Sequence, residues 1–230
     1  MLHAGGSTGI DRLRRGKFRQ QLRYYERQYL CGQQRGARRS VAHRVGVLTE
    51  AAGTDRVGNI RTVAAAVLLD ADGKLAGVTL DELELSVSAD GTGKVTTPTD
   101  TRTKRQKGKD YPLAEVSGLK KGWAEQADAF GDWLKGKTPD EVKKLKTDAD
   151  GKPTDADLLS GCTIAVDRYR DAIVRACENA QVLGAARGDT VKLGVEVAEM
   201  PQGLTGTDDK DAQVQAKITL AVVTMDEKPG

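Results

Sequence analysis

The chain is poor in the residues that metal sites and histidine-assisted nucleophiles require. Its 230 residues include three cysteines and two histidines, and aromatic side chains make up 4% of the total. Both histidines, His3 and His43, lie near the start, so the remainder cannot build a Ser–His or Cys–His nucleophile, and a zinc site is not expected. The cysteines, Cys31, Cys162 and Cys177, are odd in number and lack C-x-x-C spacing, which argues against a disulfide framework.

Long apolar runs are also missing. No stretch approaches about 18 apolar residues, so the sequence predicts no transmembrane segment, and the apolar core of a signal peptide is not visible near the start. Apolar residues make up 38% of the chain and charged residues 30%. This balance predicts a soluble domain with a modest core and a highly charged surface.

Charge is divided unevenly along the chain. Residues 1–62 contain 12 Arg, one Lys and four acidic residues, a balance of +9, whereas residues 63–230 contain 6 Arg, 17 Lys and 29 acidic residues, a balance of −6. An acidic body does not favour nucleic acid as its main partner. Residues 1–44 are interpreted as a separate basic extension. It is either a basic arm with a helix at 12–29, a poorly ordered segment or a misplaced start.

From Val45 onward the pattern predicts β-structure. Two apolar runs, residues 63–69 and 75–85, flank the sequence Asp-Ala-Asp-Gly-Lys at 70–74, which is typical of a tight hairpin turn. Residues 51–58 are expected to be a loop, and residues 88–110 a loop or an edge ribbon.

Two amphipathic helices are expected after these strands. Large apolar residues recur at three- and four-residue spacing over residues 118–134 and again after residue 163. In the first helix they are Trp123, Ala127, Phe130 and Leu134, and in the second Val166, Tyr169, Ile173 and Cys177. Between the two helices, Thr138 and Glu141 form a capping box that starts a short helix.

Residues 189–230 resemble the beginning of the body. Leu193-Gly194-Val195 corresponds to Val45-Gly46-Val47, and residues 218–225 correspond to residues 63–69. Two strands cannot bury a core alone, so this pair should join the sheet of the first unit or that of another chain. The predicted fold is therefore α+β, an antiparallel sheet with two main amphipathic helices packed on it. The organisation is a basic extension at 1–44, the α+β domain at 45–188 and an extra C-terminal strand pair at 189–230.

The candidate site is the turn Asp157-Leu158-Leu159-Ser160-Gly161-Cys162-Thr163. Small residues there present the Thr163 hydroxyl at what the pattern predicts to be the first turn of the second long helix. Free N–H groups and the positive end of the helix dipole suit an anion such as phosphate at that place. Without a ligand, Ser160 or Thr163 would simply cap the helix.

Asp157, Ser160, Gly161 and Thr163 match the pattern D-x-x-[ST]-G-A-T, with Cys162 at the alanine position. The motif follows a strand, an Asp-Gly-Lys turn, a second strand and an amphipathic helix. In this order the stretch from residue 63 to 180 resembles the FMN-binding domain family of sodium-pumping quinone reductase subunits and exported flavoproteins of extracellular electron transfer. It also resembles poorly characterised secreted or lipoprotein-type proteins of Gram-positive bacteria.

The resemblance implies that a flavin transferase esterifies FMN to Thr163, with Gly161 allowing close backbone approach and Asp157 ordering the turn or positioning metal and phosphate. The residues expected to bind this cofactor are Asp157, Ser160, Gly161 and Thr163. The protein would then be an extracytoplasmic or cell-surface redox carrier with redox partners, rather than an enzyme. The alternative is a non-catalytic surface protein that assembles into homo-oligomers by adding edge strands.

Overall fold

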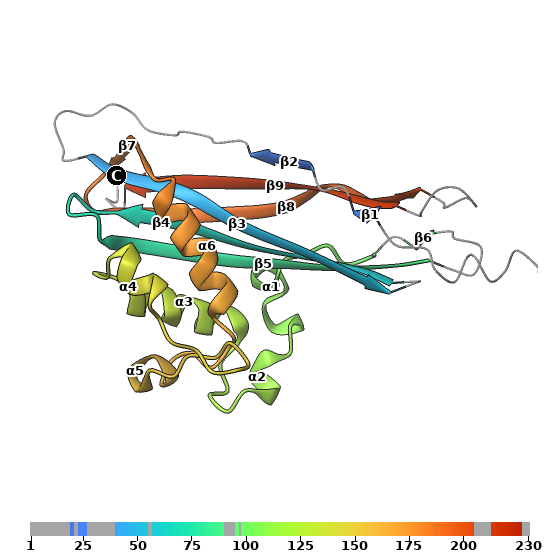
Figure 1. The fold of residues 1–230 in the computed structure, drawn as a ribbon, viewed down its shortest axis with the longest axis horizontal. Helices are drawn as coiled ribbons and strands as arrows, with labels where there is room; N and C mark the ends of the chain where they lie inside the picture. Colours follow the sequence, from blue (N-terminus) through green and yellow to red (C-terminus); the bar gives the residue numbers. More distant parts are fainter. Residues whose placement is uncertain are drawn as a thin grey trace, which may run out of the picture.

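The structure is a computed structural model and describes residues 19–20, 23–26, 40–54, 57–89, 95–96, 98–204 and 213–226. These residues form an α+β fold in which two β-sheets stack and helices cover one outer face (Figure 1). The strands are β1 (Arg19–Gln20), β2 (Arg23–Glu26), β3 (Ser40–Thr54), β4 (Val57–Leu69), β5 (Leu75–Ala89), β6 (Val95–Thr96), β7 (Gln181–Ala186), β8 (Asp189–Leu204) and β9 (Gln213–Asp226). The helices are α1 (Lys104–Lys107), a 3₁₀ turn (Gly108–Asp110), α2 (Leu113–Val116), α3 (Trp123–Leu134), α4 (Pro139–Lys143), α5 (Ala156–Leu159) and α6 (Asp167–Glu178).

The first sheet has the strand order β6-β5-β4-β3-β7, with every neighbour antiparallel. The predicted hairpin turn joins β4 to β5. In it, one carboxylate oxygen of Asp70 accepts the backbone N–H groups of Asp72 and Lys74, each at 2.9 Å. Gly73 has φ +75°, which a side chain would strain. The turn prediction is confirmed.

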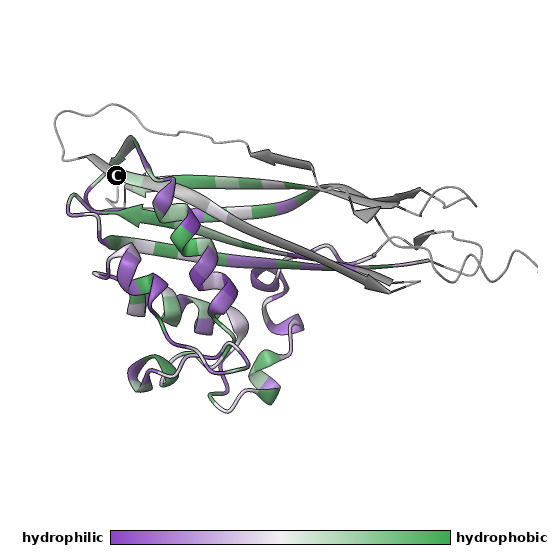
Figure 2. Ribbon diagram, in the orientation of Figure 1, coloured by the Kyte–Doolittle hydropathy of each residue, from purple (hydrophilic) through white to green (hydrophobic). Residues whose placement is uncertain are grey.

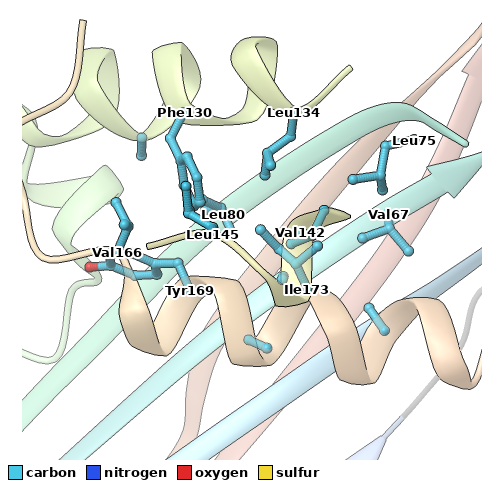
Figure 3. Packing of buried hydrophobic residues seen from close by; sticks show 14 of the residues in the cluster. Val67, Leu75, Leu80, Phe130, Leu134, Val142, Leu145, Val166, Tyr169 and Ile173 are labelled. Atoms are coloured by element: carbon cyan, nitrogen blue, oxygen red, sulfur yellow. The ribbon is translucent and has the colours of Figure 1, made fainter. Parts of the chain in front are cut away.

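Helices α3 and α6 pack on one face of this sheet. The residues they bury include the apolar ones that recur at three- and four-residue spacing in the sequence. Phe130, Leu134 and Ile173 are fully buried and meet Val67 and Leu80 of the sheet (Figure 3). Cys177 belongs to the same core, as its place on the apolar face predicts. The two main amphipathic helices are therefore confirmed, and α4 begins at the predicted capping box of Thr138 and Glu141.

The second sheet covers the opposite face of the first. β8 and β9 form an antiparallel pair, and their apolar residues alternate along each strand (Figure 2). Val195, Ile218 and Leu220 from this pair pack against Ala64 and Leu68 of β4. The predicted strand pair is thus present, but it stacks face to face on the first sheet and does not extend it.

The basic extension contains more strand than the pattern predicts. β1 and β2 run parallel to β9 within the stretch 12–29, where a basic helix was one of three alternatives, and β3 begins at Ser40. The residues of β1 and β2 are therefore strand and not helix. The remaining residues of 1–39 lie outside the described part of the chain.

The expectation of a loop at 51–58 is wrong for residues 51–54 and 57–58, and residues 55–56 lie outside the described part of the chain. β3 continues to Thr54 and β4 begins at Val57, with every residue between Ala42 and Thr54 paired across the hairpin. Gly53 and Gly58 are weak strand formers, but they pair with each other across the hairpin, and this pairing overrides that preference. In the stretch 88–110, the expected edge ribbon is the short strand β6, and α1 is an additional helix.

The outer edge of β8 is partly engaged by polar side chains of the first sheet and α1. The Thr79 hydroxyl donates to Val191 O at 2.7 Å, and Gln106 Nε2 donates to Val195 O at 3.4 Å. Strand addition by another copy stays a prediction. In the described ranges no helix combines the length and the apolar character that crossing a membrane demands.

Candidate functional site

A pocket of about 880 Å³ opens on the helical side of the molecule. Its walls come from β4, α1, the segment between α1 and α3, the turn at residues 148–154 and the α5–α6 connection. Its lining includes aliphatic residues such as Leu113 and Val116, one carboxylate, Asp148, and three further groups of side chains. These are the aromatic residues Tyr111, Trp123 and Tyr169, the basic residues Arg61, Lys104 and Lys152, and the hydroxyl residues Ser117, Thr154 and Thr163. Such a mixture of ring surface and converging polar groups is typical of a small-molecule site.

Arg61 and Lys104 form the charged floor of the pocket, in a cluster with two carboxylates, Glu82 and Glu84, that pair with them but do not line the pocket. Glu82 on β5 is fully buried and accepts a hydrogen bond from Arg61 on β4, and its Oε1 lies 3.1 Å from Lys104 Nζ. Glu84, which is 43% exposed, also contacts Lys104, at 3.0 Å. Arg61 and Glu84 are direct cross-strand neighbours, so the sheet register itself creates the cluster.

Two aromatic side chains continue this cluster into the pocket wall. The Tyr169 hydroxyl donates to Glu82 Oε2, and Trp123 Nε1 donates to the Tyr169 oxygen at 3.1 Å. The two rings meet edge to face, with their centroids 5.9 Å apart. Helices α3 and α6 are therefore joined to β5 by a continuous buried hydrogen-bond chain, which fixes the pocket wall.

The surroundings decide the charge states of this cluster. Burial alone would raise the pKa of Glu82, but Arg61, Lys104 and the Tyr169 hydroxyl outweigh it and lower that pKa below its usual value. Burial opposes the charge on Lys104, yet Glu82 and Glu84 raise the pKa of Lys104 above normal. The pKa of Tyr169 is raised well above normal because the phenol is buried and faces the Glu82 carboxylate. These pKa shifts favour an ionised Glu82, a protonated Lys104 and a neutral Tyr169 phenol at neutral pH.

Helix α1 places Lys104 over this floor. Thr103 and Gln106 form a reciprocal capping box at its start. The buried Asp81 carboxylate accepts the backbone N–H of Arg105 at 3.3 Å, which holds the helix against β5. Lys104 Nζ also lies 4.9 Å from the centre of the Tyr111 ring, a cation–π contact that holds this ring at the pocket.

The turn that carries Lys152 has the same sequence as the hairpin turn at residues 70–74. Asp148 Oδ1 accepts the backbone N–H groups of Asp150 and Lys152, each at 2.9 Å, and Gly151 has φ +78°. The Lys152 ammonium is half-exposed and 3.8 Å from Asp150 Oδ2. This lysine is therefore the most accessible cation on the pocket wall.

Thr163 lies on the pocket wall, but not at a helix start. Helix α6 begins at Asp167, and Val166 N donates to Gly151 O at 2.7 Å. The expectation of an anion held by the first turn of this helix is therefore wrong. Instead, Thr163 is set in place by its fully buried neighbours Cys162 and Val166, which anchor the connection between α5 and α6 in the core.

The Thr163 hydroxyl is held by helix α3. Its O–H donates to Gln126 Oε1 at 3.1 Å, and the backbone N–H of Thr163 donates to the same oxygen at 2.9 Å. Thr163 is half-buried, and Gln126 is fully buried. The hydroxyl is thus a positioned group at the pocket surface and caps no helix.

The other residues of the motif have structural roles. Asp157 is exposed, and its backbone carbonyl accepts from the Ser160 hydroxyl at 2.7 Å. The N-cap of α6 is Val166, which makes no side-chain cap hydrogen bond, so neither Ser160 nor Thr163 caps this helix as predicted. Asp155 caps the short helix α5. A side chain at Gly161 would lie 3.0 Å from Ala129 Cβ of α3, so glycine allows helix packing at this position. Among the predicted cofactor residues, only Thr163 lines the pocket.

Sequence reasoning missed Arg61, Glu82, Glu84 and Gln126. The apolar alternation on β5 shifts from Val78 and Leu80 to Leu83 and Leu85. This shift marks the place where Glu82 and Glu84 take over the helix-facing positions, and two acidic residues on a buried strand face were the available signal. The pattern Thr103-x-x-Gln106 likewise predicts the cap of α1.

Comparison of the chain with protein-family models, with curated proteins and with solved structures finds no match. Among the described residues, no group of three or more His, Cys, Asp or Glu side chains is arranged to hold a metal ion. The functional interpretation therefore depends on the pocket and on the motif that contributes Thr163 to it.

Proposed function

We propose that this protein is a flavin carrier in which an FMN group is esterified through its phosphate to Thr163. The observation that carries the proposal is the position of the Thr163 hydroxyl on the wall of an aromatic-lined pocket of about 880 Å³. A threonine that only capped a helix would have no need of such a pocket. Bound FMN would supply reversible electron transfer, so the protein would pass electrons between redox partners outside the cytoplasm.

The pocket residues fit an FMN group. Its volume lies within the range of roughly 300–1,000 Å³ that is usual for small-molecule sites. Tyr111, Leu113 and Val116 supply apolar lining of the kind that an isoalloxazine ring needs, and Val116 is 80% exposed. Lys152 offers positive charge for a phosphate. Cys162, which departs from the family pattern, points into the core and takes no pocket space.

Attachment requires an outside donor, FAD, and a flavin transferase. Thr163 Oγ1 attacks the FMN-side phosphorus of FAD, and a new P–O bond forms while the P–O bond to the AMP phosphate breaks. AMP leaves with the electron pair, and the hydroxyl proton passes to solvent. No oxidant or reductant is consumed in this step.

The test is incubation of the purified protein with FAD, Mg²⁺ and a bacterial flavin transferase. The intact mass should rise by one FMN less one water, and the added mass should lie on the peptide that contains Thr163. Thr163→Val should remain unmodified, since it keeps the shape of the side chain but lacks the oxygen.

Thr154→Val is the matched control. Thr154 also lines the pocket, and its hydroxyl donates to Lys146 O at 3.4 Å, outside the motif. This variant should accept FMN as the parent protein does. A parent protein that stays unmodified while an established acceptor is labelled in the same tube would refute the proposed function.

A further inference from the structure

Gln126 is a buried residue that hydrogen-bonds to Thr163, the proposed attachment point. It lies on α3, is fully buried, and reaches across to the α5–α6 connection. A buried amide among apolar residues costs free energy unless each of its hydrogen-bonding groups has a partner. The partners of Gln126 therefore show what its burial achieves.

Those partners fix the orientation of the amide. Gln126 Nε2 donates to Ser117 Oγ at 2.9 Å and to Lys121 O at 3.0 Å. A backbone carbonyl only accepts hydrogen bonds, so the NH₂ group must face Lys121. On the other side the backbone N–H of Thr163 only donates, so Oε1 must face Thr163. In a flipped amide, Oε1 would face the carbonyl oxygen of Lys121 and the NH₂ group would face the N–H of Thr163, so neither contact could be a hydrogen bond.

A fixed amide oxygen determines where the Thr163 proton points. The hydroxyl donates to Gln126 Oε1 at 3.1 Å, so its hydrogen is directed at α3 and its free lone pairs are directed elsewhere. An amide oxygen is too weak a base to take the proton at neutral pH, so Gln126 cannot act as the general base. It can only orient the nucleophilic oxygen.

We infer that Gln126 is a positioning residue that holds the Thr163 hydroxyl in one rotamer for phosphoryl-group attachment. The inference rests on the proposed function, since it names the residue that prepares the same hydroxyl. Positioning of this kind accelerates a reaction because the attacking atom is already aligned, and a misplacement of about 1 Å costs about 100-fold in rate. Gln126 thereby governs the rate of attachment and not the affinity of the pocket.

The experiment compares Gln126→Met with Thr79→Val. Gln126→Met keeps the length of the side chain and removes both bonds to Thr163. Thr79→Val removes the hydrogen bond from Thr79 to Val191 O, and Thr79 neither lines the pocket nor hydrogen-bonds to Gln126. Urea unfolding gives the stability that each variant has lost, so a rate loss caused only by general destabilisation would follow that stability in both variants.

The first measurement is the single-turnover rate of FMN transfer at saturating FAD and transferase, with non-covalent FMN affinity measured by fluorescence. We expect Gln126→Met to lower the rate by about 100-fold with FMN affinity unchanged within about threefold, and Thr79→Val to stay close to the parent in both. Equal rate losses in the two variants, or a loss that follows FMN affinity, would overturn the inference.

The second measurement needs no flavin. Side-chain coupling constants from NMR should show one Thr163 rotamer in the parent protein and in Thr79→Val, and an averaged rotamer in Gln126→Met. A fixed rotamer in Gln126→Met would overturn the inference. A parent protein that is never labelled would instead refute the proposed function, and the rotamer comparison would still decide whether Gln126 holds the hydroxyl.

Discussion

Gly46 on β3 allows α6 to touch the sheet backbone. A Cβ built on this glycine would lie 1.9 Å from Ala172 O and 2.6 Å from Ala176 N, both of them backbone atoms of the helix. Backbone atoms cannot rotate away as a side chain can. Gly46→Ala should therefore force the whole helix to move and should destabilise the protein strongly.

The size of the effect follows from the overlap. A carbon and a carbonyl oxygen approach to about 3.3 Å, so α6 would have to retreat by about 1.4 Å from a gap of 1.9 Å. Overpacking of a core costs about 1–3 kcal/mol and occasionally more. Because the fully buried contacts of Ala172, Ile173 and Ala176 would be loosened together, we expect about 3 kcal/mol. For a chain of this size that corresponds to a fall in Tm of roughly 6–12 °C.

Gly194 on β8 is the matched control. A Cβ at Gly194 would meet nothing closer than Ala221 Cβ at 3.9 Å. Since glycine within a strand is less stable than alanine by about 0.5–1 kcal/mol, Gly194→Ala should be neutral or slightly stabilising. Urea unfolding followed by circular dichroism measures both variants. If the unfolding free energies of Gly46→Ala and Gly194→Ala agree within about 1 kcal/mol, the packing argument fails.

Further predictions concern the buried charges and thiols. Glu82→Gln should cost about 3–5 kcal/mol in urea unfolding because the buried Lys104 and the partly buried Arg61 lose a charged partner, whereas Glu84→Gln, at a 43% exposed side chain, should cost about 0–1 kcal/mol; equal losses would contradict the cluster. The pKa of Glu82 is lower in the folded than in the unfolded chain, so its stabilisation is present above the usual glutamate pKa and disappears as pH falls through the folded value. The unfolding free energy of the parent protein should therefore drop on acidification more steeply than that of Glu82→Gln. Burial raises the pKa of Cys162 to about 11 and of Cys177 to about 12, so native Cys31→Ser protein should leave a thiol reagent unreacted until urea is added; rapid reaction in buffer would show that these cysteines are accessible.

Much of the fold follows from local pattern. The hairpin turn at residues 70–74, the apolar faces of α3 and α6 and the cap at Thr138 are each determined by residues close together in sequence, and each is confirmed. The stacking of β8 and β9 could not be predicted in the same way. It depends on β4 being apolar on both faces, and an apolar run does not reveal which element covers each face.

The candidate site was only partly predictable for a similar reason. The motif identified Thr163, but Gln126, Lys104 and Glu82 come from three other elements and meet at the pocket through tertiary packing alone. The sequence prediction placed the start of α6 four residues too early. Thr163 precedes a turn, and the buried side chains of Cys162 and Val166 fix the shape of that turn. Small residues before an amphipathic pattern do not distinguish a cap from a connection.

Strand β4 contributes alternate residues to both cores. Val63, Ala65 and Val67 face the helices, while Ala64 and Leu68 face β8 and β9. If either the helices or the second sheet separated, one apolar face of β4 would be exposed to water, so the molecule should unfold as a single cooperative unit. The stability of the pocket then depends on the second sheet, although β8 and β9 contribute no lining residue. Substitutions that weaken β9 should shorten ligand residence by raising the population of the opened state, at a distance and without altering any pocket side chain.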